Sequence, residues 1–320
     1  MLFVGATLYA GGAIHYWLGW PGWVRDFGAV FFVGVCLFYW FIPWQHQRIR
    51  RLICLSFLAV LFIAYFAKTP IERTWDPRHE KRVTAVIDGD LVTFSNFRDA
   101  VHRIDEPAHV RWTTRTVDLS TLQSAELIMQ PFGSFKALEH VMMSFAFADG
   151  RHVAVSMEAR RIEGGKFDAL AGFFRHDELY PVIGTERDIL GKRLAQLTPS
   201  EMQIYPLKAT PEVLRTYFMR IVDLANHVEE KPQFYSTITD SCMTTLVKLA
   251  PEVFDKVPLS DIRRWIPGYS LSLLQDLGLI DNSLPPEANA EKHRLRSGIA
   301  SPEEFPDDPS WSAALRQVNQ

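Results

Sequence analysis

Residues 139–158 read EHVMMSFAFADGRHVAVSME, a pattern that predicts a β-hairpin. Apolar residues alternate along both arms, so each arm presents one apolar face. A three-residue turn at 148–150, with Gly150 in the left-handed conformation, brings the two apolar faces to the same side, whereas a two-residue turn would separate them. The pairs predicted by this register are Ser144 with Ala154, Met142 with Ser156, and His140 with Glu158. The hairpin therefore predicts an imidazole beside a carboxylate on the face with small or polar side chains.

His140 and Glu158 have the form of a general base and the group that orients it. A carboxylate at one imidazole nitrogen fixes the tautomer and stabilises the imidazolium, which leaves the other nitrogen for a thiol proton. The alternative is a cross-strand ion pair on a solvated face, where such pairs contribute little to stability. The first interpretation requires a nucleophile elsewhere in the chain.

Residues 234–249, FYSTITDSCMTTLVKL, place a cysteine at the start of a predicted helix. Asp240 and Ser241 are both good N-cap residues, and Pro251 helps to end the helix. Unpaired backbone N–H groups and the positive end of the helix dipole favour a thiolate at Cys242, and a thiolate is the nucleophilic form. The alternative is a buried structural cysteine.

The first 68 residues are more apolar than the rest of the chain. Three charge-free runs, at 2–20, 27–44 and 52–67, have 19, 18 and 16 residues and are long enough to cross or nearly cross a bilayer. The basic cluster of Arg48, Arg50 and Arg51 should stay cytoplasmic, which places everything after Lys68 outside. We therefore expect a three-span anchor in residues 1–68; a cleaved signal peptide is the alternative for the first run.

Composition limits the partners of the exported part. Of the 34 basic and 37 acidic residues in the chain, 29 and 36 lie in residues 69–320, a mildly acidic balance that argues against nucleic acid. Cys36 and Cys54 lie in the second and third apolar runs, so Cys242 is the only cysteine of the exported part. An unpaired thiol in an oxidising compartment favours either burial or use.

The chain after the anchor divides by composition. Residues 69–82 are charged, contain Pro70 and Pro77, and predict a linker. Residues 83–281 predict an α+β domain, and residues 282–320, rich in Pro, Glu, Asp and Ser, predict an irregular tail. Besides the hairpin, the expected strands are 83–87, 91–97, 110–119, 125–130, 179–183 and 202–207, and the expected helices include 167–174, a helix from Thr185 to Leu194, and 211–227.

Four short segments together resemble the Lnb N-terminal periplasmic domain family, a bacterial family named for a lipoprotein N-acyltransferase. They are SNFR at 95–98, the hairpin from His140 through the SMEAR sequence at 156–160, TERD at 185–188, and the segment from Tyr235 to Thr245. The resemblance covers roughly residues 83–250. The family usually has Asn before the cysteine, whereas this chain has Ser241, which keeps the helix cap and removes an amide side chain.

The resemblance implies a circularly permuted papain-like (NlpC-like) domain, in which an antiparallel sheet is packed with helices and the histidine strand precedes the cysteine helix. It implies that Cys242 attacks an acyl carbonyl, that His140 acts as base and then acid, and that Glu158 orients His140. The backbone N–H of Cys242 would help to hold the oxyanion. Further candidates for substrate or oxyanion contacts are Tyr235, Arg98, Arg187 and Ser156.

The resulting functional hypothesis is a cysteine acyltransferase or amidase, multi-pass in the bacterial cytoplasmic membrane, with its soluble domain in the periplasm. Its expected partners are membrane lipids or a lipid-linked protein substrate. We expect no cofactor and no metal, because neither His152 nor His176 has metal-ligand spacing with Cys242. The alternatives are a cell-wall peptidase or amidase of the NlpC-like group and, outside enzymes, a membrane-bound periplasmic scaffold.

Overall fold

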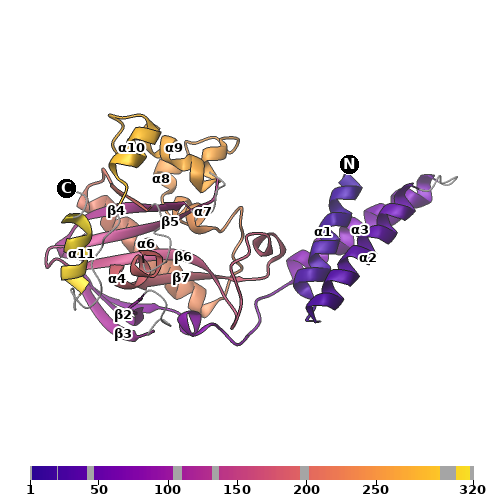
Figure 1. Ribbon diagram of the computed structural model, residues 1–320, viewed down its shortest axis with the longest axis horizontal. Coiled ribbons are helices and arrows are strands. Elements are labelled where there is room, and N and C mark those ends of the chain that lie inside the picture. Colours follow the sequence, from indigo (N-terminus) through magenta and orange to yellow (C-terminus); the bar gives the residue numbers. More distant parts are fainter. Residues whose placement is uncertain are drawn as a thin grey trace.

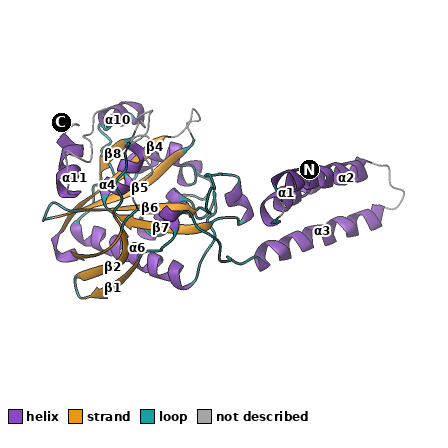
Figure 2. Ribbon diagram, turned by 60° about the horizontal axis from the view of Figure 1, so that its bottom comes forward, coloured by secondary structure: helices purple, strands orange, loops and turns teal. Residues whose placement is uncertain are grey.

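The structure is a computed structural model that describes residues 2–19, 21–41, 47–103, 110–131, 137–194, 202–295 and 308–317. Three N-terminal helices stand beside a domain of sheet and helices, and an extended segment joins α3 to that domain (Figure 1). The N-terminal helices are α1 (Leu2–Trp17), α2 (Gly22–Phe41) and α3 (Gln47–Ala67). In Figure 2, α3 runs beside α1 and α2 and ends next to the domain.

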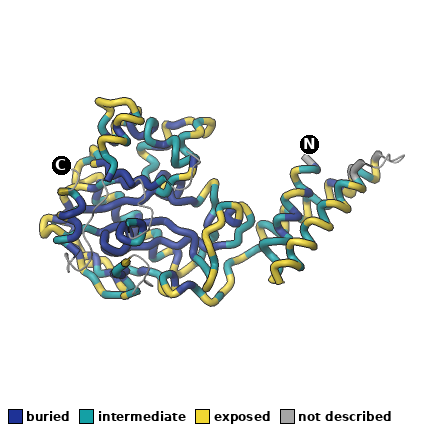
Figure 3. The backbone as a smooth tube through the Cα atoms, viewed as in Figure 1, coloured by how far each residue is buried: buried dark blue, intermediate teal, exposed yellow. Residues whose placement is uncertain are grey.

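Two of these helices are long and apolar enough to cross a membrane, over the windows Gly22–Tyr39 and Arg48–Ala67. Figure 3 shows that most of their surface is exposed or half-buried, in contrast to the buried sheet of the domain. The span predicted at 2–20 is too short in the structure, because α1 ends at Trp17 and has only 16 residues, whereas a span needs about 20. Gly11 lets α1 pack closely on α2: an added Cβ would lie 2.5 Å from Val33 Cγ2.

The domain is α+β, and its centre is an eight-stranded, mostly antiparallel sheet. The strands are β1 (Thr84–Asp88), β2 (Leu91–Arg98), β3 (Trp112–Asp118), β4 (Leu122–Pro131), β5 (Glu139–Phe147), β6 (His152–Arg160), β7 (Glu178–Gly184) and β8 (Gln203–Pro206). Their order is β1-β2-β7-β6-β5-β4-β8, and β3 also pairs with β2. One pairing, β2 with β7, is parallel.

The β5–β6 hairpin has the predicted register. Ser144 pairs with Ala154 and Met142 with Ser156, and Gly150 has a positive φ of 80°. The last predicted pair, His140 with Glu158, is wrong. The pairing of β5 with β6 ends at Met142 and Ser156, because beyond that point each strand follows its other neighbour: His140 pairs with Gln130 of β4, and Glu158 with Tyr180 of β7.

Helices cover both faces of the sheet. One face packs on α6 (Pro211–Glu230), α7 (Cys242–Lys248), α8 (Pro251–Phe254) and α9 (Ser270–Asp276), and its core contains Val141, Met143 and Phe145. The other face packs on α4 (Glu186–Ile189) and α11 (Asp308–Gln317), and its core contains Met142 and Ala154. Alternate residues of the hairpin therefore enter different cores, which explains why its second face is apolar in part.

The C-terminal region is more ordered than predicted. Instead of an irregular tail over 282–320, the structure contains α10 (Pro286–Lys292) and α11; residues 296–307 and 318–320 lie outside the described residues. Trp311 and Leu315 of α11 are buried against the sheet, and Arg316 forms ion pairs with Glu126 and Glu186. The open sheet face supplies the apolar surface that this short helix covers, and the local sequence carries no sign of that surface.

Candidate active site

Cys242 is the first residue of α7, which packs on the hairpin strands β5 and β6. A capping box fixes the start of this helix: Ser241 Oγ accepts from Thr244 N at 3.3 Å, and Thr244 Oγ1 accepts from Ser241 N at 2.8 Å. The predicted cap at Ser241 is confirmed. The thiol of Cys242 donates to the carbonyl of Glu139 at 3.9 Å, so the sulfur lies beside the strand that carries His140.

A cavity of about 260 Å³ brings the principal predicted residues together. Cys242, His140, Glu158 and Tyr235 all line it, from α7, β5, β6 and the loop before α7. Its remaining walls combine apolar residues with Arg161, Lys192 and Arg193. Cys242 is only 6% exposed, so a reagent reaches the sulfur through the cavity.

Ser156 stands between His140 and Glu158. His140 Nε2 lies 2.7 Å from Ser156 Oγ, and Ser156 Oγ donates to Glu158 Oε1 at 3.1 Å. A hydroxyl carries one hydrogen, so Ser156 accepts from a protonated Nε2 while it donates to the carboxylate. This tautomer leaves Nδ1 of His140 as the ring nitrogen that can accept a proton. The carboxylate therefore orients His140 through Ser156.

Arg193, Lys192 and the imidazole of His79 surround Glu158; burial lowers the pKa of His79 to about 4, so this imidazole is neutral in the neutral range. Arg193 Nη2 lies 3.0 Å from Oε1, and Lys192 Nζ lies 3.5 Å from Oε2. His79, from the short helix η1 (Pro77–His79) at the end of the expected linker, lies 3.5 Å from Oε2. Burial raises the pKa of Glu158, but Lys192, His79 and Arg193 outweigh it and hold that pKa well below its usual range. Glu158 is therefore ionised throughout the neutral range.

The thiol and the imidazole are both neutral at rest. Burial, with Arg193 adding to it and Glu158 opposing, lowers the pKa of His140 to about 3. Burial also raises the pKa of the Cys242 thiol, although the backbone N–H of Val141 opposes this shift. The expected thiolate at the helix start is thus corrected: desolvation by the strands packed on α7 outweighs the backbone N–H groups.

Tyr235 lies directly beside Cys242. Burial, together with the nearby sulfur, raises the pKa of Tyr235, while a hydrogen bond from the backbone N–H of Cys242 opposes the shift. The backbone N–H expected at the oxyanion position therefore faces the Tyr235 hydroxyl. A phenol both accepts and donates hydrogen bonds. If an oxyanion takes the place of the contact between the Tyr235 hydroxyl and the Cys242 N–H, both groups can donate to it.

Arg98 and Arg187 lie elsewhere. Neither is among the described residues that line the cavity. Arg98 is buried, and its Nε lies 2.8 Å from Asp188 Oδ2; Arg187 Nη2 lies 2.9 Å from Asp99 Oδ1. Both ion pairs join the end of β2 to the start of α4. These two arginines hold the fold together rather than contact a substrate in this cavity.

His79, Arg161, Lys192 and Arg193 are site residues that the sequence did not reveal. His79 precedes the first strand, and Lys192 and Arg193 lie in the last turn of the helix predicted from Thr185 to Leu194, as ordinary surface cations would. The only local signal was the position of Arg161 directly after the SMEAR segment. The convergence of His79, Lys192 and Arg193 on Glu158 depends on contacts between residues distant in sequence.

A second group of titratable residues lies at the other end of the hairpin. Glu126, His152 and Glu186 offer ligand atoms within 4.8 Å of one another. Arg316 occupies this cluster: its guanidinium pairs with both carboxylates and lies 3.1 Å from His152 Nδ1. The cluster thus serves as a salt-bridge network that attaches α11.

Comparison with known proteins identifies the family of the chain. A family model described as the Lnb N-terminal periplasmic domain matches residues 108–268, a range that contains His140, Ser156, Glu158, Tyr235 and Cys242. Searches of curated proteins and of solved structures found no match. The matched range is half of the sequence, and the chain belongs to the Lnb N-terminal periplasmic domain family.

Proposed function

We propose that this protein is a membrane-anchored periplasmic thiol enzyme that transfers or releases an acyl group from a lipid-linked ester or amide. The observation that carries the proposal is the single cavity where Cys242, the His140–Ser156–Glu158 chain and Tyr235 meet. The order of histidine strand and cysteine helix supports a permuted papain-like arrangement. A buried, neutral thiol beside a neutral base suits activation at the moment of attack.

The proposed reaction has two halves. The Cys242 S–H proton passes to Nδ1 of His140 as sulfur attacks the acyl carbonyl, and the carbonyl electrons move to oxygen. The backbone N–H of Cys242 and the Tyr235 hydroxyl stabilise that oxyanion. Collapse expels the alcohol or amine, which takes the proton from His140 and leaves a thioester on Cys242. An amine acceptor or water then attacks the thioester by the same steps in reverse.

The loop between β6 and β7 supports a substrate that comes from the bilayer. Phe167 and Ala169 of this loop line the Cys242 cavity. A few residues later, the short helix η3 (Ala171–Phe174) packs on α1, where the Phe174 ring stacks on Tyr9 and Tyr16 with centroids 4.8 and 4.9 Å apart. One loop thus connects the N-terminal helices to the wall of the Cys242 cavity. A lipid beside the helices would lie near the mouth of that cavity.

The test is Cys242→Ala in the full-length protein in vesicles. We expect the variant to lose acyl transfer entirely and to remain folded, because a short side chain at a helix start contributes little packing. The parent protein should gain the mass of the acyl group, and the variant should not, when intact mass is measured after incubation with lipid. Adding an amine acceptor separates transfer from hydrolysis.

Cys54→Ala is the matched control, because Cys54 is also a buried cysteine but lies in α3. It should keep full activity and the acyl adduct. Equal activity of Cys242→Ala and the parent protein would remove the enzyme proposal and favour a scaffold.

A further inference from the structure

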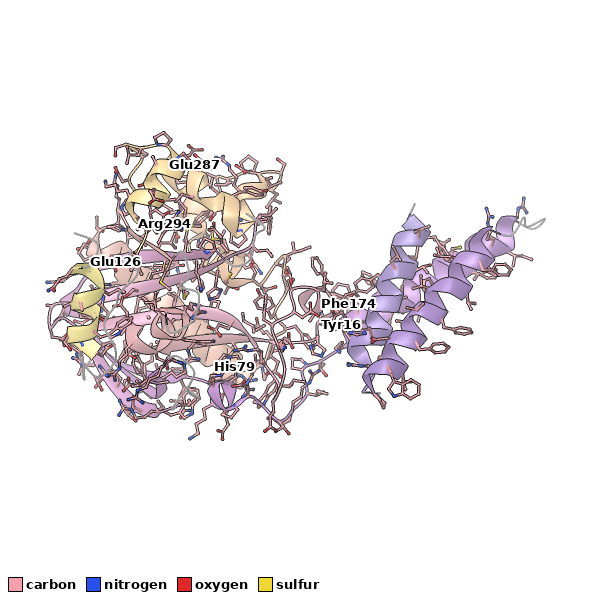
Figure 4. The ribbon with its side chains drawn as sticks, viewed as in Figure 1. Tyr16, His79, Glu126, Phe174, Glu287 and Arg294 are labelled. Carbon is pink, nitrogen blue, oxygen red and sulfur yellow. The ribbon has the colours of Figure 1, made fainter. Side chains whose placement is uncertain are left out.

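Arg161 belongs to two cavities at once. It follows the end of β6 and lines the cavity that holds Cys242. It also lines a second cavity of about 200 Å³, whose walls include His15, Tyr16 and Arg25 from the ends of α1 and α2 and the segment that leads to η3. Figure 4 shows this junction, with Tyr16 and Phe174 together where α1 meets the domain. Arg161 therefore lies between the helix ends and the reactive thiol.

The backbone of Arg161 is fixed by hydrogen bonds, whereas its guanidinium has no partner among the described residues. Its N–H donates to His79 Nδ1 at 2.8 Å, and its carbonyl accepts from Asp76 N at 3.0 Å. Among the described residues, no carboxylate or carbonyl lies within hydrogen-bond or ion-pair distance of the side chain. Glu158 and Asp76 act on it only as more distant charges. A half-buried cation without a partner is costly to the fold, which is typical of a group kept for a ligand.

The preceding residue provides the contrast. Arg160 donates to His79 O at 2.9 Å, to Glu80 O at 2.7 Å and to Glu178 Oε2 at 3.2 Å. Its guanidinium lies over the Trp75 ring, 4.0 Å from the centroid. Two adjacent arginines thus have different surroundings: Arg160 is fully engaged in the fold, whereas Arg161 lines two cavities.

The second cavity holds more positive than negative charge available to a ligand. Arg25, Arg161 and Lys166 line it, and none has a carboxylate partner in the described part of the chain. Two carboxylates also line it, Asp168, which accepts from the Tyr16 hydroxyl, and Asp177, which lies 2.7 Å from His176 Nδ1. The three cations outnumber these acids, and Arg25 also donates to the carbonyl of His15 at 3.3 Å. Arginine and lysine around a small cavity are suited to a phosphate.

We propose that Arg161, with Arg25 and Lys166, binds the phosphate of a glycerophospholipid whose acyl ester extends into the Cys242 cavity. The proposal rests on the proposed acyl chemistry and names its donor. The helix ends of α1 and α2 place this site at headgroup level beside the apolar helices. In a glycerophospholipid, only the glycerol unit separates the phosphate from the ester carbonyl, which matches a cation that borders both cavities.

The test measures binding without catalysis. The background is full-length Cys242→Ala in detergent, and the probes are dihexanoyl phosphatidylethanolamine, dihexanoylglycerol and glycerol phosphate, measured by calorimetry. Arg161→Gln should weaken phosphatidylethanolamine binding about tenfold or more, equivalent to about 1.4 kcal/mol. It should not change binding of dihexanoylglycerol, which has the same chains without the phosphate. Lys166→Gln, at an exposed position that does not threaten folding, should weaken phosphatidylethanolamine binding several-fold.

Arg151→Gln is the matched control, because Arg151 pairs with Asp149 in the hairpin turn, at the other end of β6 from Arg161; it should leave all affinities unchanged. Unaltered phosphatidylethanolamine affinity in both Arg161→Gln and Lys166→Gln would overturn the site. Equal, Arg161-dependent binding of glycerol phosphate and of the lipid would also overturn it, because a soluble phosphate ester would then suffice. If parent protein transfers no acyl group but Arg161-dependent lipid binding persists, the lipid site stands and the proposed enzyme activity fails.

Discussion

At the scale of single residues, Ser156 is the group that changes the expected chemistry. The sequence predicted a direct contact between His140 and Glu158, and the structure inserts a hydroxyl between them. That hydroxyl fixes the imidazole tautomer, which a carboxylate fixes directly in the Ser-His-Asp triad. Glu158 is also the counter-charge for Lys192 and Arg193. One carboxylate thus maintains both the charge balance of the site and the orientation of the base.

We predict that Ser156→Ala lowers turnover on the order of 10- to 100-fold, because His140 loses the acceptor for its Nε2–H. The substrate concentration for half-maximal rate should change little, since the hydroxyl is buried beneath the base. Steady-state acyl transfer measures both quantities. Ser144→Ala removes a buried hydroxyl from the neighbouring strand, where it donates to Glu186, and should retain turnover. A similar loss in both variants would indicate a general effect on the sheet.

A second prediction concerns the resting thiol. Because burial raises the pKa of Cys242, the thiolate population should grow only at alkaline pH. The rate of alkylation by iodoacetamide, followed by intact mass, should therefore rise steadily with pH beyond the ordinary cysteine value of about 8.5. Cys242→Ala corrects for any reaction at Cys36 and Cys54. A rate plateau beginning below neutral pH would show a resting ion pair instead, and the neutral-pair description of the site would be wrong.

At the scale of elements, α11 is the helix that completes the second core. Its residue Asp308 is 4% exposed, and both carboxylate oxygens lack a hydrogen-bond partner among the described residues. Burial, increased by the nearby charge of Glu186, raises the pKa of Asp308 to about 7. Asp308 is therefore mostly protonated below about pH 7 and ionises above it in the folded protein.

The raised pKa of Asp308 makes the stability of the folded protein depend on pH. The folded-state pKa is above the unfolded value, so the stabilisation is complete below the ordinary value of 3.8 and is lost as pH rises through about 7. We expect the free energy of unfolding to fall over that range, by an amount on the order of a few kcal/mol. Asp308→Asn should flatten this slope in chemical denaturation at several pH values. Asp276→Asn, at an exposed position, provides the control; an unchanged slope in Asp308→Asn would contradict the assignment.

At the scale of the whole molecule, the anchor and the site are physically connected. Figure 1 shows that α3 begins at the end of the N-terminal helices that is far from the domain. Arg48, Arg50 and Arg51 lie at this start of α3. At the near end, Tyr9 donates to Phe173 O at 3.1 Å, and Trp17 donates to Phe174 O.

We predict that Gly12→Leu separates the helices from the cavity loop. An added Cβ at Gly12 would lie 2.2 Å from Phe174 Cζ, so a larger side chain must displace the Phe174 ring from its place between η3 and α1. Transfer from lipid in vesicles should fall about tenfold or more, while transfer from a short, water-soluble thioester should persist. Gly5→Leu is the control on the same helix, because nothing lies within 4 Å of a Cβ there. Equal loss with both substrates would mean that the substitution damages the domain itself.

The sequence by itself determined what depends on neighbouring residues. The period of two along 139–158 and the turn at Gly150 specify the hairpin register, and Ser241 specifies the helix start at Cys242, because each is settled within a few residues of chain. The α+β class and the apolar anchor helices follow from the same local patterns. The family match covers the hairpin and the helix start at Cys242.

Only the tertiary structure established which side chains meet. His140 and Glu158 are separated because their strands diverge to follow different neighbours, and Ser156 fills the interval. Tyr235 faces the N–H of Cys242, and α11 closes the sheet, through packing between segments far apart in sequence. Such contacts depend on how strands twist and how helices pack, which no short stretch of residues encodes. The partner of His140 is therefore a property of the assembled sheet.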